Sequence, residues 1–202
     1  MTTTRTGSRV HRVSLHPLPP FIIIFSLSQA KPTQANPEEE GSSIQPTKLV
    51  DEVCHSTSSY SLCVESLCTD PRTPSADRYV LAYISFRLAF LNASSTQDHI
   101  AKLLKHTEAK AKAKAKANTG PTQQVLRRCY HDYNKAVSAL SSAYNDLNSE
   151  TFSDLVDWAG AASLAADDCQ VVVKTTYPPL STMNLDLKRL CEICVAVSKL
   201  FT

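Results

Sequence analysis

The stretch Cys54-His-Ser-Thr-Ser-Ser-Tyr-Ser-Leu-Cys63 places two cysteines at the ends of a short polar turn rich in serine. Apolar side chains flank this turn on both sides, within residues 49–53 and 62–67. The arrangement predicts a small helical hairpin whose two arms are joined by a disulfide. Such a bridge, closing a loop of about 10 residues, is worth about 2.5–3 kcal/mol through the entropy of the unfolded chain.

A second pair of cysteines, Cys129 and Cys169, lies near the outer ends of two helical heptad patterns, each 20 residues from Ser149. If the chain folds back at Ser149, these patterns form antiparallel helices with arms of about 30 Å, at 1.5 Å per residue. The two sulfur atoms then lie at the same level. We therefore predict a second disulfide, which closes a loop of about 40 residues and is worth about 4 kcal/mol by the same estimate.

Apolar residues recur at helical spacing in four long segments after the hairpin,. The first segment is expected to begin at Thr73-Pro74, to have a weak point at 92–96, and to continue until Gly120 ends it as a C-cap. The others occupy residues 126–147, 152–169 and about 181–200. The predicted fold class is all-α, with an N-terminal helical hairpin followed by an up-down-up-down four-helix bundle and two disulfides.

The N-terminal residues 1–30 are typical of a secretory signal peptide. Three arginines precede a short apolar run at 21–27, and Ser28-Gln-Ala30 offers small residues for cleavage, with Ala35 as another candidate,. A membrane anchor is the alternative, although the run is about half of the roughly 20 residues that span a bilayer; an organellar transit peptide also fits. Residues 31–46 are predicted to be a disordered linker, and residues 47–202 the mature domain.

The rest of the chain favours binding over catalysis. Without the leader, 18 basic side chains face 19 acidic ones, and nothing in that balance calls for nucleic acid,. The sequence has no Gly-rich phosphate loop, no His-Glu-x-x-His motif and no Gly-x-Ser-x-Gly elbow, so we expect neither an enzyme nor a cofactor,.

Seven cysteines leave at least one outside the two predicted bridges. Cys191-x-x-Cys194 is a weak zinc pattern without further ligands, and we expect both to be buried thiols, or one to form a local bridge to Cys68,. On a secretory route the sequon Asn92-Ala93-Ser94 is a candidate glycosylation site,.

A low-complexity run of alternating alanine and lysine occupies residues 108–117 and contains Lys110, Lys112, Lys114 and Lys116. Two interpretations stay open. The run is either a solvated helix end, or a docking segment for an acidic partner such as a pectic polysaccharide or a membrane surface.

The segment Leu49-Val50-Asp51-Glu52-Val53-Cys54, the spacing to Cys63, and Asp70-Pro71-Arg72-Thr73-Pro74 resemble the start of the plant invertase and pectin methylesterase inhibitor family. Cys129-Tyr130-x-x-Tyr133-x-x-Ala136-Val137 matches the family's second-helix signature, and the spacing to Cys169 also fits. The resemblance covers about residues 47–202. It implies the same hairpin and bundle, with disulfides Cys54–Cys63 and Cys129–Cys169.

The resemblance further implies a secreted inhibitor, of the cell wall or apoplast or of the vacuole, that forms a stoichiometric complex with a pectin methylesterase or an acid invertase and blocks its active-site cleft. Pectin methylesterase inhibitors use polar faces of the bundle helices, whereas invertase inhibitors insert a Pro-Lys-Phe turn. Here that triplet is Glu150-Thr151-Phe152, so these three are the candidate partner-binding residues. After removal of the signal no membrane contact is implied. Two alternatives are a non-inhibitory wall module that binds acidic pectin through the Ala-Lys run, and a detached pro-region of the kind fused to pectin methylesterases.

Overall fold

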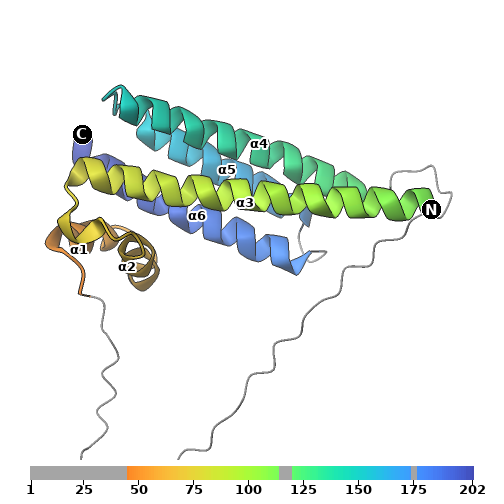
Figure 1. Cartoon of the computed structure of the whole chain (residues 1–202), viewed down its shortest axis with the longest axis horizontal. Coiled ribbons are helices and arrows are strands. Elements are labelled where there is room, and N and C mark those ends of the chain that lie inside the picture. Colours follow the sequence, from red (N-terminus) through yellow and green to blue (C-terminus); the bar gives the residue numbers. More distant parts are fainter. Residues whose placement is uncertain (1–44, 114–119, 174–176) are drawn as a thin grey trace, which may run out of the picture. The chain divides into compact units, whose positions relative to one another are not determined.

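The chain is described by a computed structural model that covers residues 45–113, 120–173 and 177–202. Figure 1 shows these residues as a small helical hairpin beside a bundle of long helices. The predicted signal peptide, most of the predicted linker, and Lys114 and Lys116 lie outside the described residues. The division of the chain at residues 30 and 46 therefore stays a prediction.

The hairpin consists of α1 (Lys48–Cys54) and α2 (Tyr60–Cys68), which are joined by the disulfide between Cys54 and Cys63. Thr47 caps α1, because its side-chain oxygen accepts a hydrogen bond of 3.3 Å from the backbone nitrogen of Val50,. Both helices pack against α6 (Pro178–Ser198), the last long helix of the chain. The hairpin therefore packs against the bundle.

The first long helix begins later than the sequence suggested. Thr73–Ser75 form a 3-10 turn, η1, and α3 spans Arg78–Ala113. The predicted start at Thr73-Pro74 is wrong because Asp77 performs the capping role: its carboxylate accepts a hydrogen bond of 2.9 Å from the backbone nitrogen of Val80,. Helix α3 then continues without interruption through the expected weak point at 92–96.

The second long helix, α4, spans Pro121–Asn148. Gly120 was expected to end the preceding helix, and this assignment is wrong. Its backbone is extended, with φ −66° and ψ 160°, and it is the N-cap of α4, since Pro121 fits the first position of a helix, where no backbone N–H is needed,. Similarly, Pro178 begins α6 three residues before the expected start at Ser181.

The bundle is completed by α5 (Leu155–Val173), which starts three residues after Phe152, and the chain ends in a 3-10 turn, η2 (Lys199–Phe201). Helix α3 packs against α4 and α6, and α5 packs against the same two helices. Successive helices are therefore neighbours in an up-down-up-down arrangement, and the disulfide between Cys129 and Cys169 joins α4 to α5. The predicted fold class, with two disulfides, is confirmed.

A chain of hydrogen-bonded polar side chains crosses the core. The hydroxyl of Tyr133 on α4, which is fully buried, donates to the side-chain oxygen of Asn184 on α6 at 2.9 Å. The amide of Asn184 donates in turn to Gln170 on α5, also at 2.9 Å. Since a buried polar group without a partner is costly, these bonds fix the register of the three helices.

Candidate functional site

Helix α5 forms an apolar ridge on the outside of the bundle. Its inward face is built from small residues, including Ala159, Ala162 and Ala166, which lets the helix lie close to its neighbours. Its outward face carries Leu164 and Val171, which are 61% and 64% exposed, and near its first turn the exposed Asp157. Apolar groups left this open in a well-packed protein are candidates for contact with a partner.

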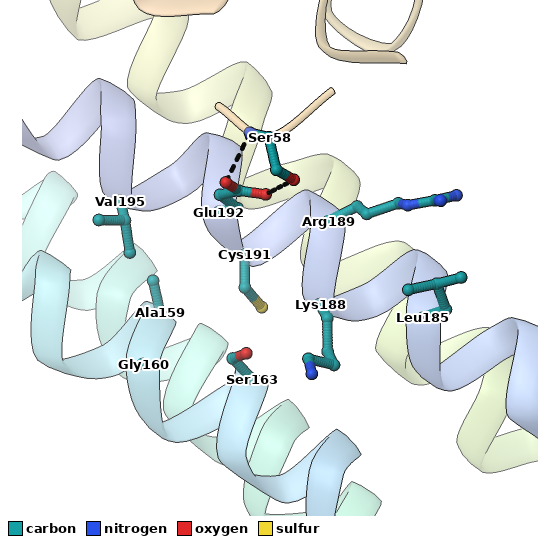
Figure 2. Close-up of a pocket in the computed structure, with 10 residues that line it drawn as sticks. All are labelled: Ser58, Ala159, Gly160, Ser163, Leu185, Lys188, Arg189, Cys191, Glu192 and Val195. Carbon is teal, nitrogen blue, oxygen red and sulfur yellow. Dashed lines mark hydrogen bonds between the residues drawn. The ribbon is translucent and has the colours of Figure 1, made fainter. Parts of the chain in front are cut away.

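One groove runs along the ridge between α5 and α6, with a volume of about 550 Å³. Figure 2 shows Cys191 and Lys188 on α6 directed toward α5, and Ser58 of the loop between α1 and α2 beside Glu192. Glu192 accepts hydrogen bonds from the backbone nitrogen and hydroxyl of Ser58, at 2.7 and 2.6 Å, which hold this loop against α6. Lys188 is held by Asp167 at 2.6 Å.

A second groove, of about 420 Å³, follows the other side of the ridge, between α4 and α5. Trp158 lies in it, and its ring nitrogen donates to Asp146 at 2.7 Å, which fixes the ring. The α4 side is polar and includes His131 and Lys135. Lys135 bonds the fully buried Asp132 at 3.2 Å. The ridge thus presents an apolar crest between two partly polar grooves, which is the composition of a protein-binding surface with an apolar centre and a polar rim.

The turn between α4 and α5 contains the residues that the resemblance assigned to partner binding. Glu150 has a positive φ of 54°, and the nitrogen of Thr151 donates to the carbonyl of Asp146 at 2.8 Å. Glu150 and Thr151 are exposed, but Phe152 is half-buried and stacks on Phe201 near the C-terminus, with ring centroids 4.4 Å apart. The structure therefore brings the three residues together but turns the aromatic ring onto the bundle itself.

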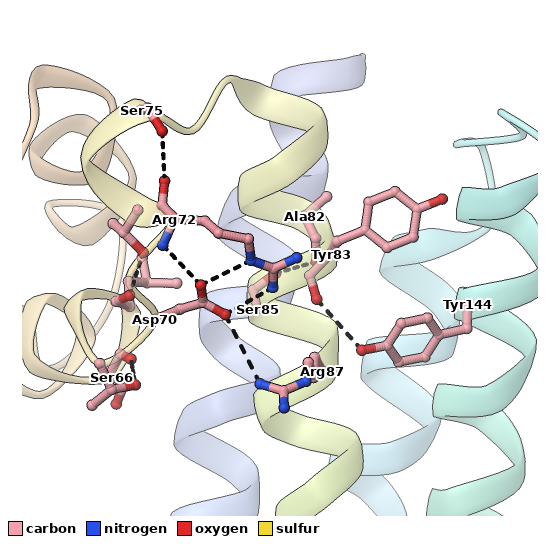
Figure 3. Close-up of polar contacts among 12 residues, drawn as sticks. Ser66, Asp70, Arg72, Ser75, Ala82, Tyr83, Ser85, Arg87 and Tyr144 are labelled. Atoms are coloured by element: carbon pink, nitrogen blue, oxygen red, sulfur yellow. Dashed lines mark hydrogen bonds and ion pairs between the residues drawn. The ribbon is translucent and has the colours of Figure 1, made fainter.

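Figure 3 shows a charged joint where the hairpin meets the bundle. Arg72 donates to both oxygens of Asp70, from Nε at 2.9 Å and from Nη2 at 2.7 Å, and Arg87 on α3 lies 3.9 Å away. The bonds from Arg72 lower the pKa of the Asp70 carboxyl from 3.8 to about 2,. Asp70 and Arg72 of the family-like Asp-Pro-Arg segment thus bond to one another, and Arg87 of α3 approaches the same carboxylate from the bundle.

The remaining candidates occupy separate places. Asn92 lies half-buried on α3, and its glycosylation stays a prediction. Cys68, Cys191 and Cys194 are unpaired, and the last two are buried, as expected for thiols that pack as small apolar groups. Within the described ranges no group of three or more potential ligands is placed to hold a metal ion. None of the described helices combines the length and apolar content of a bilayer-spanning helix.

Sequence reasoning missed the α5 ridge. The available signal was that Leu164 and Val171 do not belong to the heptad series of α5 yet are apolar, in a helix that contains no basic residue. An extra apolar stripe outside the core register indicates a second contact surface.

The described part of the chain is thus a disulfide-closed helical bundle with an exposed helix face. The chain belongs to the plant invertase/pectin methylesterase inhibitor family, whose profile matches residues 48–197. The family and the relatives below carry the names of enzyme inhibitors, which agrees with the expectation that the chain is not an enzyme.

The chain is similar both to a named inhibitor of fructosidase and to a named pectinesterase inhibitor. "Cell wall / vacuolar inhibitor of fructosidase 2" of Arabidopsis thaliana is 30% identical over 156 residues, which are 73% of this chain and 79% of that protein. A pectinesterase inhibitor of Actinidia deliciosa is 30% identical over 157 residues, covering 75% and 78%. A crystal structure of a mutant form of a pectin methylesterase inhibitor from Arabidopsis shares the fold, with a TM-score of 0.62 at 20% identity over 76% of this chain and 97% of that one.

Proposed function

We propose that the protein inhibits a pectin methylesterase of the plant cell wall by forming a stoichiometric complex in which the α5 ridge and its two flanking grooves cover the substrate cleft. Inhibition is steric. The enzyme's cleft loses access to the polymer, and no bond is made or broken in the inhibitor. The ridge supplies the apolar centre of the interface, and the groove residues supply its polar rim.

The observation that carries this proposal is the contrast between Phe152 and the ridge. Insertion of Phe152 into an enzyme would first require its ring to leave Phe201, and an aromatic pair is worth about 0.5–1.5 kcal/mol beyond burial,. Leu164 and Val171 are exposed before any partner arrives, so their burial is a gain without a preceding loss,.

The choice of pectin methylesterase over acid invertase rests on the same turn. The resemblance assigns insertion into invertase to a Pro-Lys-Phe triplet, and this chain has glutamate and threonine in place of the proline and lysine. The relatives cannot decide, since an inhibitor of each kind is 30% identical. Without the triplet, contact through a helix face is the better supported mode, and in this chain that face combines polar groove residues with an apolar crest.

The proposal is tested with Leu164→Asp, a charge placed on the crest of the ridge. We expect inhibition of a pectin methylesterase to weaken about tenfold or more, as for an apolar anchor at the centre of an interface. Leu91→Asp is the matched control, because Leu91 is 47% exposed on α3, away from the ridge. Residual enzyme activity is measured against inhibitor concentration for both variants, and for Phe152→Ala.

Equal inhibition by Leu164→Asp and Leu91→Asp would refute the ridge as the contact surface. Loss of inhibition in Phe152→Ala alone, with an acid invertase as the target, would replace the helix-face mode by insertion of the turn.

The same proposal gives the protein its route and location. Removal of residues 1–30 as a signal peptide releases the inhibitor domain, residues 47–202, with the linker 31–46 ahead of it, into the cell wall or the vacuole, two places that the name of the Arabidopsis thaliana relative also mentions. An oxidising route is in keeping with two disulfides,. N-terminal sequencing of the exported protein tests this, and an unprocessed Met1 would contradict it.

A further inference from the structure

A basic surface lies away from the α5 ridge, where the C-terminal half of α3 runs beside the N-terminal half of α4 (Figure 1). We define it by its exposed cations, which are Lys102, Lys105, Lys110, Lys112 and Arg127. The two helices are joined there by Glu108 of α3, which accepts hydrogen bonds from Gln123 at 3.1 Å and from Arg127 at 3.0 Å. The cations therefore sit on two rigid helices with a fixed separation.

Most of this positive charge is uncompensated. In the described part of the chain, the ion pair between Arg127 and Glu108 is the one that involves a member of the basic surface. Lys112 also acts on Glu108, since Arg127 first and Lys112 more weakly lower the pKa of that carboxyl. Asp98 and Glu108 are the carboxylates among the described residues of 98–112 and 121–127, against five cations. The surface thus presents a local excess of positive charge.

The residues around the basic surface limit the class of partner that can bind there. None of the large, exposed apolar side chains of the described residues lies in 98–112 or 121–127. An interfacial membrane helix needs an exposed apolar face, and binding of single-stranded nucleic acid relies on exposed aromatic rings. A flexible polymer of regularly spaced carboxylates needs neither, because spaced cations suffice.

We infer that the basic surface binds an acidic polysaccharide, namely pectin whose methyl esters have been hydrolysed. This inference rests on the proposed function: a pectin methylesterase converts neutral methyl esters into free carboxylates, so its product is a polyanion. Lys105 and Lys112 are seven residues apart on α3, about 10 Å along the axis at 1.5 Å per residue, so they contact carboxylates of different sugar units. The inhibitor is thereby retained where its target enzyme has already acted.

The basic surface adjoins the proposed inhibitory face without sharing a residue with it. Arg127 is oriented toward α3 by Glu108, and His131, one turn further along α4, already lines the groove beside the ridge. The four lysines lie on α3, and no residue of α3 lines either groove, so a polymer bound to the lysines leaves the ridge free for the enzyme.

The test compares two variants with the same change in net charge. Lys105→Glu with Lys112→Glu reverses two cations of the basic surface, and Lys48→Glu with Lys199→Glu reverses two exposed lysines elsewhere. Binding of the mature protein to polygalacturonate is measured by calorimetry, without any enzyme present. We expect the first pair to raise Kd about tenfold or more and the control pair to change it less than about threefold, since exposed charges act over roughly 10 Å at moderate salt.

Two further measurements vary the ionic strength and the methyl-esterification of the polymer. Binding should be lost as ionic strength rises from about 0.01 M to about 1 M, where the Debye length falls from roughly 30 Å to 3 Å. Fully methyl-esterified pectin should not bind. Equal weakening by both charge reversals, salt-insensitive binding, or a preference for anionic lipid vesicles or DNA over polygalacturonate would overturn the inference. Failure of the protein to inhibit the enzyme would refute the proposed function and leave the polymer measurement intact.

Discussion

Phe152 stacks on Phe201 with ring centroids 4.4 Å apart and an angle of 14° between the ring planes. The contact joins the turn between α4 and α5 to the C-terminal turn η2. Tyr79 at the start of α3 adds tilted contacts to both rings, at 5.6 and 5.4 Å. The guanidinium of Arg78 lies 5.3 Å from the Phe201 ring and donates to the carbonyl of Leu200 at 3.3 Å. The turn between α4 and α5 is thus attached both to the start of α3 and to the C-terminal turn η2.

This stacking predicts energetic coupling between Phe152 and Phe201. In a double-mutant cycle with alanine at each position, we expect a coupling of about 0.5–1.5 kcal/mol in the free energy of unfolding. Urea denaturation of the wild type, both single variants and the double variant gives this value. Leu91→Ala combined with Phe201→Ala is the control and should be additive. Strict additivity for the two phenylalanines would show that the stack contributes no stability.

The sequence was sufficient for the architecture because the deciding interactions are periodic or local. Heptad spacing gave the four bundle helices, and the equal distances of Cys129 and Cys169 from Ser149 predicted the pairing that the structure contains. Periodicity did not predict the orientation of Phe152, because its ring packs on Phe201, which lies near the C-terminus of the chain. The prediction that Gly120 ends a helix was wrong for a different reason. Glycine and proline occur at both ends of helices, and the backbone angles show which end they mark,.

The two disulfides should contribute unequally to stability. The bridge between Cys129 and Cys169 spans 40 residues and the bridge between Cys54 and Cys63 spans 9, so the chain-entropy estimate gives about 4 and about 2.5–3 kcal/mol,. We expect Cys129→Ser with Cys169→Ser to lower the unfolding free energy more than Cys54→Ser with Cys63→Ser. Denaturation of both double variants under non-reducing conditions measures this. A larger loss from the hairpin pair would mean that native contacts, not loop closure, decide the order.

The joint between hairpin and bundle should make stability depend on acid pH. The pKa of Asp70 is lowered to about 2 in the folded protein, chiefly by the hydrogen bonds from Arg72. A lowered carboxyl pKa stabilises the fold above the unfolded value of 3.8, and this contribution is lost as the pH falls through about 2,. Asp70→Asn should therefore be less stable than the wild type at pH 6 and show a shallower loss between pH 4 and 2. An unchanged slope would remove Asp70 from the acid response.

The three unpaired thiols should differ in reactivity. Burial raises the pKa of all three thiols: that of Cys191 to about 12, that of Cys194 well above its usual value, and that of Cys68. Cys191 and Cys194 are buried, but Cys68 is only half-buried and is therefore the one that a reagent can reach. Since the thiolate is the nucleophile, a folded sample treated with iodoacetamide should be labelled first at Cys68. Peptide mapping before and after denaturation checks this. Equal labelling of Cys191 in the native state would show that the groove between α5 and α6 admits the reagent.

Gly160 should reveal whether stability and inhibition are separable on the α5 ridge. It lies on the exposed side of α5, and a Cβ atom added there would meet nothing within 4 Å. Because glycine costs about 1 kcal/mol relative to alanine inside a helix, Gly160→Ala should raise the unfolding free energy by about 0.5–1 kcal/mol. Gly160→Arg should fold equally well, since long side chains favour helices and the site is open, but its bulk should stop the ridge from docking on the enzyme. Parallel denaturation and inhibition curves separate the two effects: full inhibition by Gly160→Arg would mean that the enzyme never approaches this part of α5.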